Sequence, residues 1–126
     1  MVISIANFKG GVSKTSTSIH VAGALGRERP TLLADRDRVK GAHRWHQKGR
    51  DWDFTTIDAD HETAVDLARQ YRRNGLVIVD TPAAPRPEEL VAFGARSDLV
   101  VVPGTPDALA IDALVATIKT LTTANV

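Results

Sequence analysis

Short apolar runs recur along the chain, and segments with helical periodicity separate them. These runs predict strands at 2–7, 31–35, 54–57, 76–80 and 99–103. Because the runs are nearly continuous rather than alternating, they are typical of strands buried on both faces of a parallel sheet. The segments between them predict helices over 14–28, 41–48, 62–73, 87–95 and 107–122. The alternation indicates one α/β domain over residues 1–126, a three-layer sandwich with a mainly parallel central sheet.

Two of the predicted helices carry end signals. The helix over 62–73 closes with basic residues and is followed by Asn74-Gly75, a usual C-terminal pattern. Asp107 follows Pro106 and is a plausible N-cap for the last helix. Apolar residues on one face predict that this last helix packs against the sheet through Ala108, Ile111, Leu114, Val115, Ile118 and Leu121.

A glycine-rich segment joins the first predicted strand to the first helix. It reads Lys9-Gly10-Gly11-Val12-Ser13-Lys14-Thr15-Ser16. A strand, a glycine-rich turn and a helix in this order form a phosphate cradle from backbone N–H groups and the helix N-terminus. In such a loop Lys14 can reach the β- and γ-phosphates of a nucleotide, and the Thr15 hydroxyl can bind Mg²⁺. The residues thus predict a P-loop NTPase-like fold, the alternative being a turn that only connects strand to helix.

Two predicted strands end in a carboxylate, Asp35 after 31–34 and Asp80 after 76–79. Ligands of open α/β sheets bind at the carboxyl ends of the strands, so both aspartates should lie near the glycine-rich loop. Asp80 precedes Thr81-Pro82-Ala83 and is predicted to hold Mg²⁺, through water, as a Walker B carboxylate does. A plain strand-capping aspartate is the alternative interpretation.

The glycine-rich loop departs from the standard P-loop pattern, because Phe8 and Ser13 occupy its two glycine positions. What remains is a Lys-Gly-Gly-Val-x-Lys-Thr core that begins with a second lysine, Lys9. This core resembles the deviant Walker A loop of the ParA/MinD superfamily of ATPases, and Asn7 fits the ParA branch. The resemblance implies ATP and Mg²⁺ as cofactors and catalytic roles for Lys9 and Lys14. It also implies a homodimer in the ATP state, in which Lys9 reaches the nucleotide of the other subunit.

The segment Asp35-Arg36-Asp37 resembles the ParA switch sequence Asp-x-Asp-Pro-Gln-Gly. The resemblance implies that Asp37 positions the attacking water and that Asp35 supports it. Arg38 and Val39 stand where the family has Pro-Gln, a departure that bears on hydrolysis more than on binding. A charged strand-to-loop turn is the alternative. Residues 81–85 would be the second switch, with prolines that stiffen the loop.

Composition narrows the class of protein. The chain has 126 residues, 43% hydrophobic and 25% charged, and a net charge of +1, which is ordinary for a globular domain. The lack of cysteine excludes disulfides and cysteine metal sites and is compatible with a reducing cytoplasm. No apolar run reaches 18 residues, so we expect no membrane span. The first strand begins at once, which leaves no room for a signal peptide. A cytoplasmic location is therefore expected.

The positive charge is concentrated between residues 36 and 50. Its cations are Arg36, Arg38, Lys40, Arg44, Lys48 and Arg50, and Asp37 is the one acidic residue there. The stretch could be a solvated face, or it could contact DNA phosphates or nucleotide. His43 and His46 lack the neighbours of a zinc site. Trp45 and Trp52 are interpreted as packing residues rather than base-stacking platforms.

The resemblance spans the whole chain but covers only the first part of the family's domain, so the C-terminal strands are expected to be missing. Their absence would leave the strand over 99–103 at an open sheet edge. The resemblance implies a partition ATPase for plasmids or chromosomes, with a ParB-type partner and nonspecific DNA binding. The alternatives are a non-hydrolysing or degenerate nucleotide-binding domain and a MinD-type membrane-linked ATPase. The chain lacks a basic amphipathic tail that would favour the membrane-linked form.

Overall fold

The computed structural model describes residues 1–49, 51–58, 66, 70 and 75–126. The helix predicted over 62–73 lies outside this part of the chain, except for Asp66 and Gln70, which are both helical. Arg50 also lies outside it.

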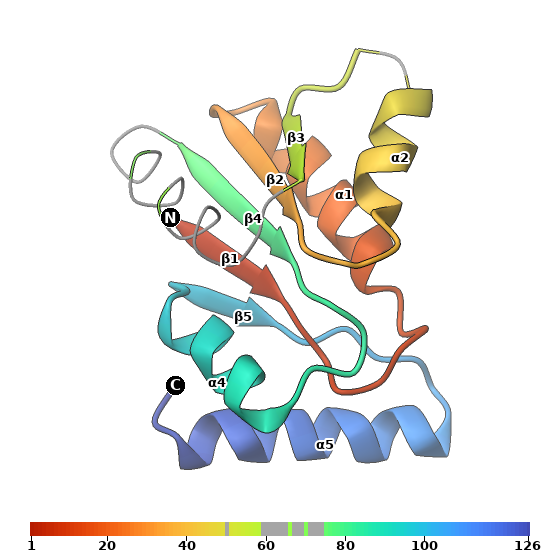
Figure 1. Cartoon of the computed structure of the whole chain (residues 1–126), viewed down its shortest axis with the longest axis vertical. Coiled ribbons are helices and arrows are strands. Elements are labelled where there is room, and N and C mark those ends of the chain that lie inside the picture. Colours follow the sequence, from red (N-terminus) through yellow and green to blue (C-terminus); the bar gives the residue numbers. More distant parts are fainter. Residues whose placement is uncertain (50, 59–65, 67–69, 71–74) are drawn as a thin grey trace.

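A parallel sheet forms the centre of the described structure (Figure 1). Its strands are β1 (Val2–Ile5), β2 (Thr31–Asp35), β3 (Thr55–Asp58), β4 (Leu76–Asp80) and β5 (Leu99–Val101), in the order β3-β2-β4-β1-β5. Every neighbouring pair is parallel. The strands predicted from apolar runs are confirmed, although β1 and β5 end two residues earlier than predicted. The order leaves β5 at one edge of the described sheet, as expected.

Helices cover both faces of this sheet. Their bounds are α1 (Lys14–Gly26), α2 (Gly41–Lys48), α4 (Pro87–Ala95) and α5 (Ala108–Thr123). On one face, Ile3 and Ile5 pack in a buried cluster with Ile19 and Ala22 of α1. On the other face, Val100 packs with Leu90 and Leu121, from α4 and α5. Figure 1 shows α1 and α2 beside β2 and β3, and α4 and α5 beside β5. The predicted three-layer α/β sandwich is confirmed.

The strand order brings the functional candidates to one edge. Since β1 pairs with β4 in the register Ile5↔Asp80, the loop that leaves β1 lies next to Asp80. Since β2 also pairs with β4, in the register Asp35↔Asp80, the two strand-ending carboxylates are neighbours. Both aspartates are fully buried. The carboxyl edge of the sheet thus holds the glycine-rich loop and both acids, as the sequence predicts.

The predicted packing face of α5 is confirmed only at its end, where Leu121 is buried. Ile111, Val115 and Ile118 are 51%, 43% and 48% exposed, whereas the buried residues of the helix are Ala110, Thr117 and Leu121. Small side chains at 110 and 117 let the helix lie close to its neighbours, and the Thr117 hydroxyl is satisfied by donating to the Ala113 carbonyl at 2.7 Å. The three bulky apolar residues Ile111, Val115 and Ile118 therefore face outward. Across the described residues, no helix is long and apolar enough to cross a bilayer.

Candidate functional site

The loop between β1 and α1 has the shape of a phosphate cradle. Gly11 and Ser13 both have positive φ, 73° and 64°, which turns successive backbone N–H groups toward a common side. Val12 between them is buried, at 1% exposure, and anchors the loop in the core. Ser13 is thus a non-glycine residue in the left-handed region, at the position where the standard P-loop has glycine.

Ser13→Gly is expected to stabilise the nucleotide-free protein by about 1 kcal/mol, because a Cβ in the left-handed region is strained and glycine removes that strain. Ser13→Ala keeps the Cβ and serves as the matched control, with a change near zero. Chemical denaturation of both variants measures the difference. A destabilised glycine variant would show that the serine side chain, and not the loop backbone, matters at this position.

The Lys14 side chain is buried against the backbone of the glycine-rich loop. Lys14 is the first residue of α1 and is 6% exposed. Its Nζ donates to the Lys9 carbonyl at 2.8 Å and to the Asn7 carbonyl at 3.4 Å. Burial lowers the pKa of Lys14, an effect that the charges of Asp80 and Asp37 oppose. The ammonium is therefore held by neutral carbonyls that phosphate oxygens could readily replace.

Asp80 has one satisfied and one unsatisfied oxygen. Its Oδ1 accepts a hydrogen bond from Ser18 Oγ at 2.9 Å, and its Oδ2 is buried with no hydrogen-bond partner. Burial raises the pKa of Asp80 to about 6, against the lowering effect of hydrogen bonds from the Thr15 and Ser18 side chains. A buried oxygen without a partner, next to a threonine hydroxyl, suits Mg²⁺, which takes hard oxygen ligands.

The predicted metal residues Thr15 and Asp80 therefore lie together. Ser18 is a partner of Asp80 that is not predicted from the sequence. Ser18 is four residues after Lys14, so both side chains lie on the same face of α1, and this spacing is the signal that could have indicated it. Among the residues that the structure describes, no cluster of three or more acidic, histidine or cysteine side chains could hold a metal. Magnesium at this edge would accordingly depend on nucleotide oxygens and water for its remaining ligands, which is usual for this ion.

Asp35 and Asp37 organise the loop after β2. Asp35 Oδ1 accepts from the Asp37 backbone N–H at 3.0 Å, and its Oδ2 accepts from the His43 N–H at 2.9 Å. Asp35 thereby fixes the backbone at Asp37 and at the start of α2. The Asp37 carboxylate accepts from the Val39 N–H at 2.9 Å and is near enough to Lys14 and Asp80 to influence the pKa of each.

A cavity of about 320 Å³ lies under the glycine-rich loop. It is lined by Gly11, Ser13, Lys14, Thr15, Ser16, Asp37 and Ala83. Most of the predicted nucleotide-binding residues and the predicted catalytic Asp37 thus share one site, and its volume is within the range of small-molecule sites. Gly10 packs beside this cavity, where a Cβ would lie 3.7 Å from Ala83 Cβ. Lys9 is not a lining residue. Its Nζ instead pairs with Asp107 at 2.8 Å.

The basic stretch is only partly available to a ligand. The Arg36 guanidinium lies over the Phe93 ring, 4.7 Å from its centroid. Lys40 pairs with Asp58 and donates to the Asp35 carbonyl. Arg38, Arg44 and Lys48 are exposed. Arg38, Arg44 and Lys48 are therefore the described cations of this stretch that are most open to a ligand.

The aromatic residues near α2 pack against one another. The ring centroids of Trp45 and Trp52 are 4.7 Å apart, and Trp52 lies 5.6 Å from Phe54. His46 Nε2 is 2.9 Å from the Phe54 carbonyl, and His43 Nδ1 is 3.1 Å from Thr56 Oγ1. The interpretation of both tryptophans as packing residues agrees with these contacts.

A parallel sheet with a glycine-rich loop after β1, and with a buried lysine and two carboxylates at its carboxyl edge, defines a P-loop nucleotide-binding domain. The family model described as the CobQ/CobB/MinD/ParA nucleotide binding domain matches residues 3–125. The chain belongs to this family.

Similar proteins support the same assignment. "Maintenance of carboxysome distribution protein A" of Gloeobacter kilaueensis is 34% identical over 120 residues, which are 93% of this chain and 55% of the relative. The chain therefore spans about half the length of this curated relative. A Cyanothece McdA variant in complex with ATP aligns with a TM-score of 0.77 at 14% identity, covering 98% of this chain and 64% of the other. The pNOB8 ParA bound to nonspecific DNA aligns with a TM-score of 0.69 at 20% identity, covering 90% and 56%. These two likenesses concern the fold.

Proposed function

We propose that this chain is a Mg²⁺- and ATP-dependent switch of the ParA kind, which dimerises when ATP is bound and acts in positioning or partitioning a cellular cargo. The observation that carries the proposal is the convergence of Lys14, Thr15 and Asp37 on one cavity, beside the buried Asp80. The family membership and the similarity to a carboxysome distribution protein support it.

Each residue has a role that follows from its chemistry. Lys14 would release the Lys9 and Asn7 carbonyls and bind β- and γ-phosphate oxygens. Thr15 and Asp80 would hold Mg²⁺, which neutralises phosphate charge and polarises the phosphoryl group. Asp37 would accept a hydrogen bond from the attacking water and orient it toward the γ-phosphorus. The backbone N–H groups of residues 10–16 would surround the phosphates.

Lys9 has a different role in this proposal. Its side chain is outside the cavity of its own subunit, so it would bind the phosphates of the nucleotide in a second copy, much as an arginine finger does. ATP would then stabilise the face-to-face dimer, and hydrolysis would release it. A ParB-type partner protein would stimulate that hydrolysis.

The mass of the protein in solution tests the switch. Light scattering with Mg-ATPγS, with Mg-ADP and without nucleotide is expected to give a dimer only with ATPγS. A mass that never changes, together with no retained nucleotide, would contradict the proposal. A nucleotide-dependent dimer without ATP turnover, even with DNA and partner present, would instead identify a non-hydrolysing binding domain.

We also propose that the ATP state binds nonspecific DNA through the exposed cations of the 36–50 stretch. Arg44 and Lys48 lie one turn apart on α2 and are exposed. Replacing both by alanine is expected to make the slope of log Kd against log salt concentration shallower by about 2, because each lost phosphate contact removes about one released counterion. Lys119→Ala on α5 is the control. An unchanged slope in the double variant would exclude this surface.

A further inference from the structure

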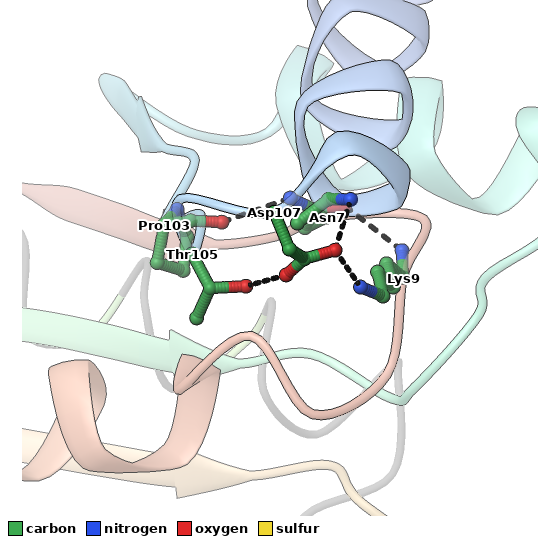
Figure 2. Close-up of polar contacts among 6 residues, drawn as sticks. Asn7, Lys9, Pro103, Thr105 and Asp107 are labelled. Atoms are coloured by element: carbon green, nitrogen blue, oxygen red, sulfur yellow. Dashed lines mark hydrogen bonds and ion pairs between the residues drawn. The ribbon is translucent and has the colours of Figure 1, made fainter.

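The start of the glycine-rich loop is tied to the region around α5. Figure 2 shows the contacts. Asn7 Nδ2 donates to the Pro103 carbonyl at 2.8 Å, and Asn7 Oδ1 accepts from the Lys9 N–H at 2.8 Å. Lys9 Nζ then donates to Asp107 Oδ1 at 2.8 Å. Residues 98 positions apart in the chain thus form an ion pair beside the proposed nucleotide site.

The Asp107 carboxylate accepts hydrogen bonds from two further donors besides Lys9. Its Oδ1 also accepts from the Ala110 N–H at 2.9 Å, which makes Asp107 the predicted N-cap of α5. Its Oδ2 accepts from Thr105 Oγ1 at 2.6 Å. Because the cap and the Thr105 bond do not involve Lys9, the helix start stays satisfied when Lys9 leaves. The ion pair can therefore open without disturbing α5.

A second link joins the same loop to α5. The Phe8 N–H donates to Thr117 Oγ1 at 3.1 Å, and Thr117 is fully buried. This bond holds the backbone before Lys9 in place. Lys9 can therefore leave Asp107 by a movement of its side chain while these two bonds hold the backbone before it.

We propose that Asp107 holds Lys9 within its own subunit in the nucleotide-free protein, as an autoinhibitory contact that the phosphates of a second subunit must displace before the dimer forms. The inference rests on the proposed function, in which Lys9 acts on the nucleotide of a second copy. One ammonium group cannot stay on Asp107 and also extend to that nucleotide. Asp107 thereby sets the threshold at which ATP produces the dimer.

The carboxylate remains charged under all ordinary conditions. Hydrogen bonds from Lys9, Thr105 and the Ala110 N–H lower the pKa of Asp107 to about 2. A change of pH in the neutral range does not open the contact, so displacement depends on competition by phosphate for Lys9.

Asp107→Asn tests the proposal, because asparagine is an equally good N-cap but carries no charge. An exposed ion pair of this kind changes an equilibrium by a small factor, and each dimer requires two to open. The dimer Kd measured by sedimentation in saturating Mg-ATPγS is expected to fall roughly two- to twenty-fold. The affinity of the monomer for a fluorescent ADP and the unfolding temperature are expected to stay as in wild type. A purely structural role for Asp107 would change these two values instead.

Asp112→Asn is the matched control, since it removes the same charge about one and a half turns further along α5 and should leave the dimer Kd unchanged. Equal dimer Kd values for wild type and Asp107→Asn, or a weaker dimer in the variant, would overturn the autoinhibitory contact but not the switch. If wild type never dimerises with ATPγS, a dimer formed by Asp107→Asn alone supports the contact. Monomers in both proteins overturn the contact and contradict the proposed switch.

Discussion

Lys14→Ala is expected to abolish nucleotide retention and, with it, the ATP-dependent dimer. Lys14 is the one cation that lines the described cavity under the loop, and its Nζ contacts only backbone carbonyls there. Charge-assisted hydrogen bonds to two phosphates are each worth about 1.5–3 kcal/mol, so their loss should weaken Mg-ATPγS binding about 100-fold or more. Titration with a fluorescent ATP analogue measures this effect.

Lys9→Ala is the informative comparison for that experiment. It removes a neighbouring lysine of the same loop, one that points away from its own cavity and toward Asp107. We expect this variant to bind nucleotide nearly as well as wild type but to remain a monomer. If the two variants lost nucleotide affinity equally, Lys9 would act within its own subunit, and its proposed role across the dimer would be wrong.

Asp80→Asn is expected to make the nucleotide-free protein more stable while removing its response to Mg²⁺. A buried carboxyl whose pKa rises from 3.8 to about 6 on folding lowers the stability of the native state by about 3 kcal/mol at neutral pH. Asparagine removes this charge but buries an amide that is only partly hydrogen-bonded. The net gain should therefore be about 1–2 kcal/mol in the free energy of unfolding.

The pH dependence of this gain follows from the direction of the pKa change. Between about pH 4 and 6 the folded protein keeps a proton on Asp80 that the unfolded chain has lost, so stability falls as pH rises through this range. The difference between Asp80→Asn and wild type should be largest at pH 7–8 and pass through zero near about pH 5. Near pH 4 the variant should be the less stable protein, because the cost of its partly bonded amide remains when the charge penalty of Asp80 is lost.

Urea denaturation of both proteins across pH 4–8 provides the measurement. Magnesium-dependent nucleotide binding should be lost in the variant at every pH. A variant less stable than wild type at pH 7 would mean that the Asp80 charge is already compensated inside the folded protein. The hydrogen bond from Ser18 at 2.9 Å would then stabilise the Asp80 carboxylate by more than burial destabilises it.

Much of the fold could be predicted because buried parallel strands carry a strong and simple signal. Segments 31–35 and 76–80 are mainly apolar and end in a carboxylate, and both form strands with those bounds. The edge that collects Lys14, Asp35 and Asp80 follows from parallel pairing alone. Predicted α2 and α4 agree with the structure to the residue.

Other features could not be predicted, because they depend on contacts between segments that are far apart in the sequence. Periodicity predicts an apolar face on α5, but of that face the helix buries Leu121 and exposes Ile111 and Val115. Periodicity shows that a helix has an apolar stripe, but not whether a neighbour covers it. The partner of Lys9 is likewise distant in sequence, and the packing of Arg36 on Phe93 joins two separate segments.

The place of β1 in the sheet also determines when this domain can fold during synthesis. Of the described strands β1 is made before the others, yet it lies between β4 and β5, pairing with Leu99–Val101 as well as with residues 77–80. At about 5–20 residues per second the ribosome needs roughly 5–20 s to produce those partners. Until residue 80 is made, β1 has no neighbouring strand, and its other edge stays open until β5 is made. The segment most important to the proposed function is therefore also the one that chaperones would have to shield longest.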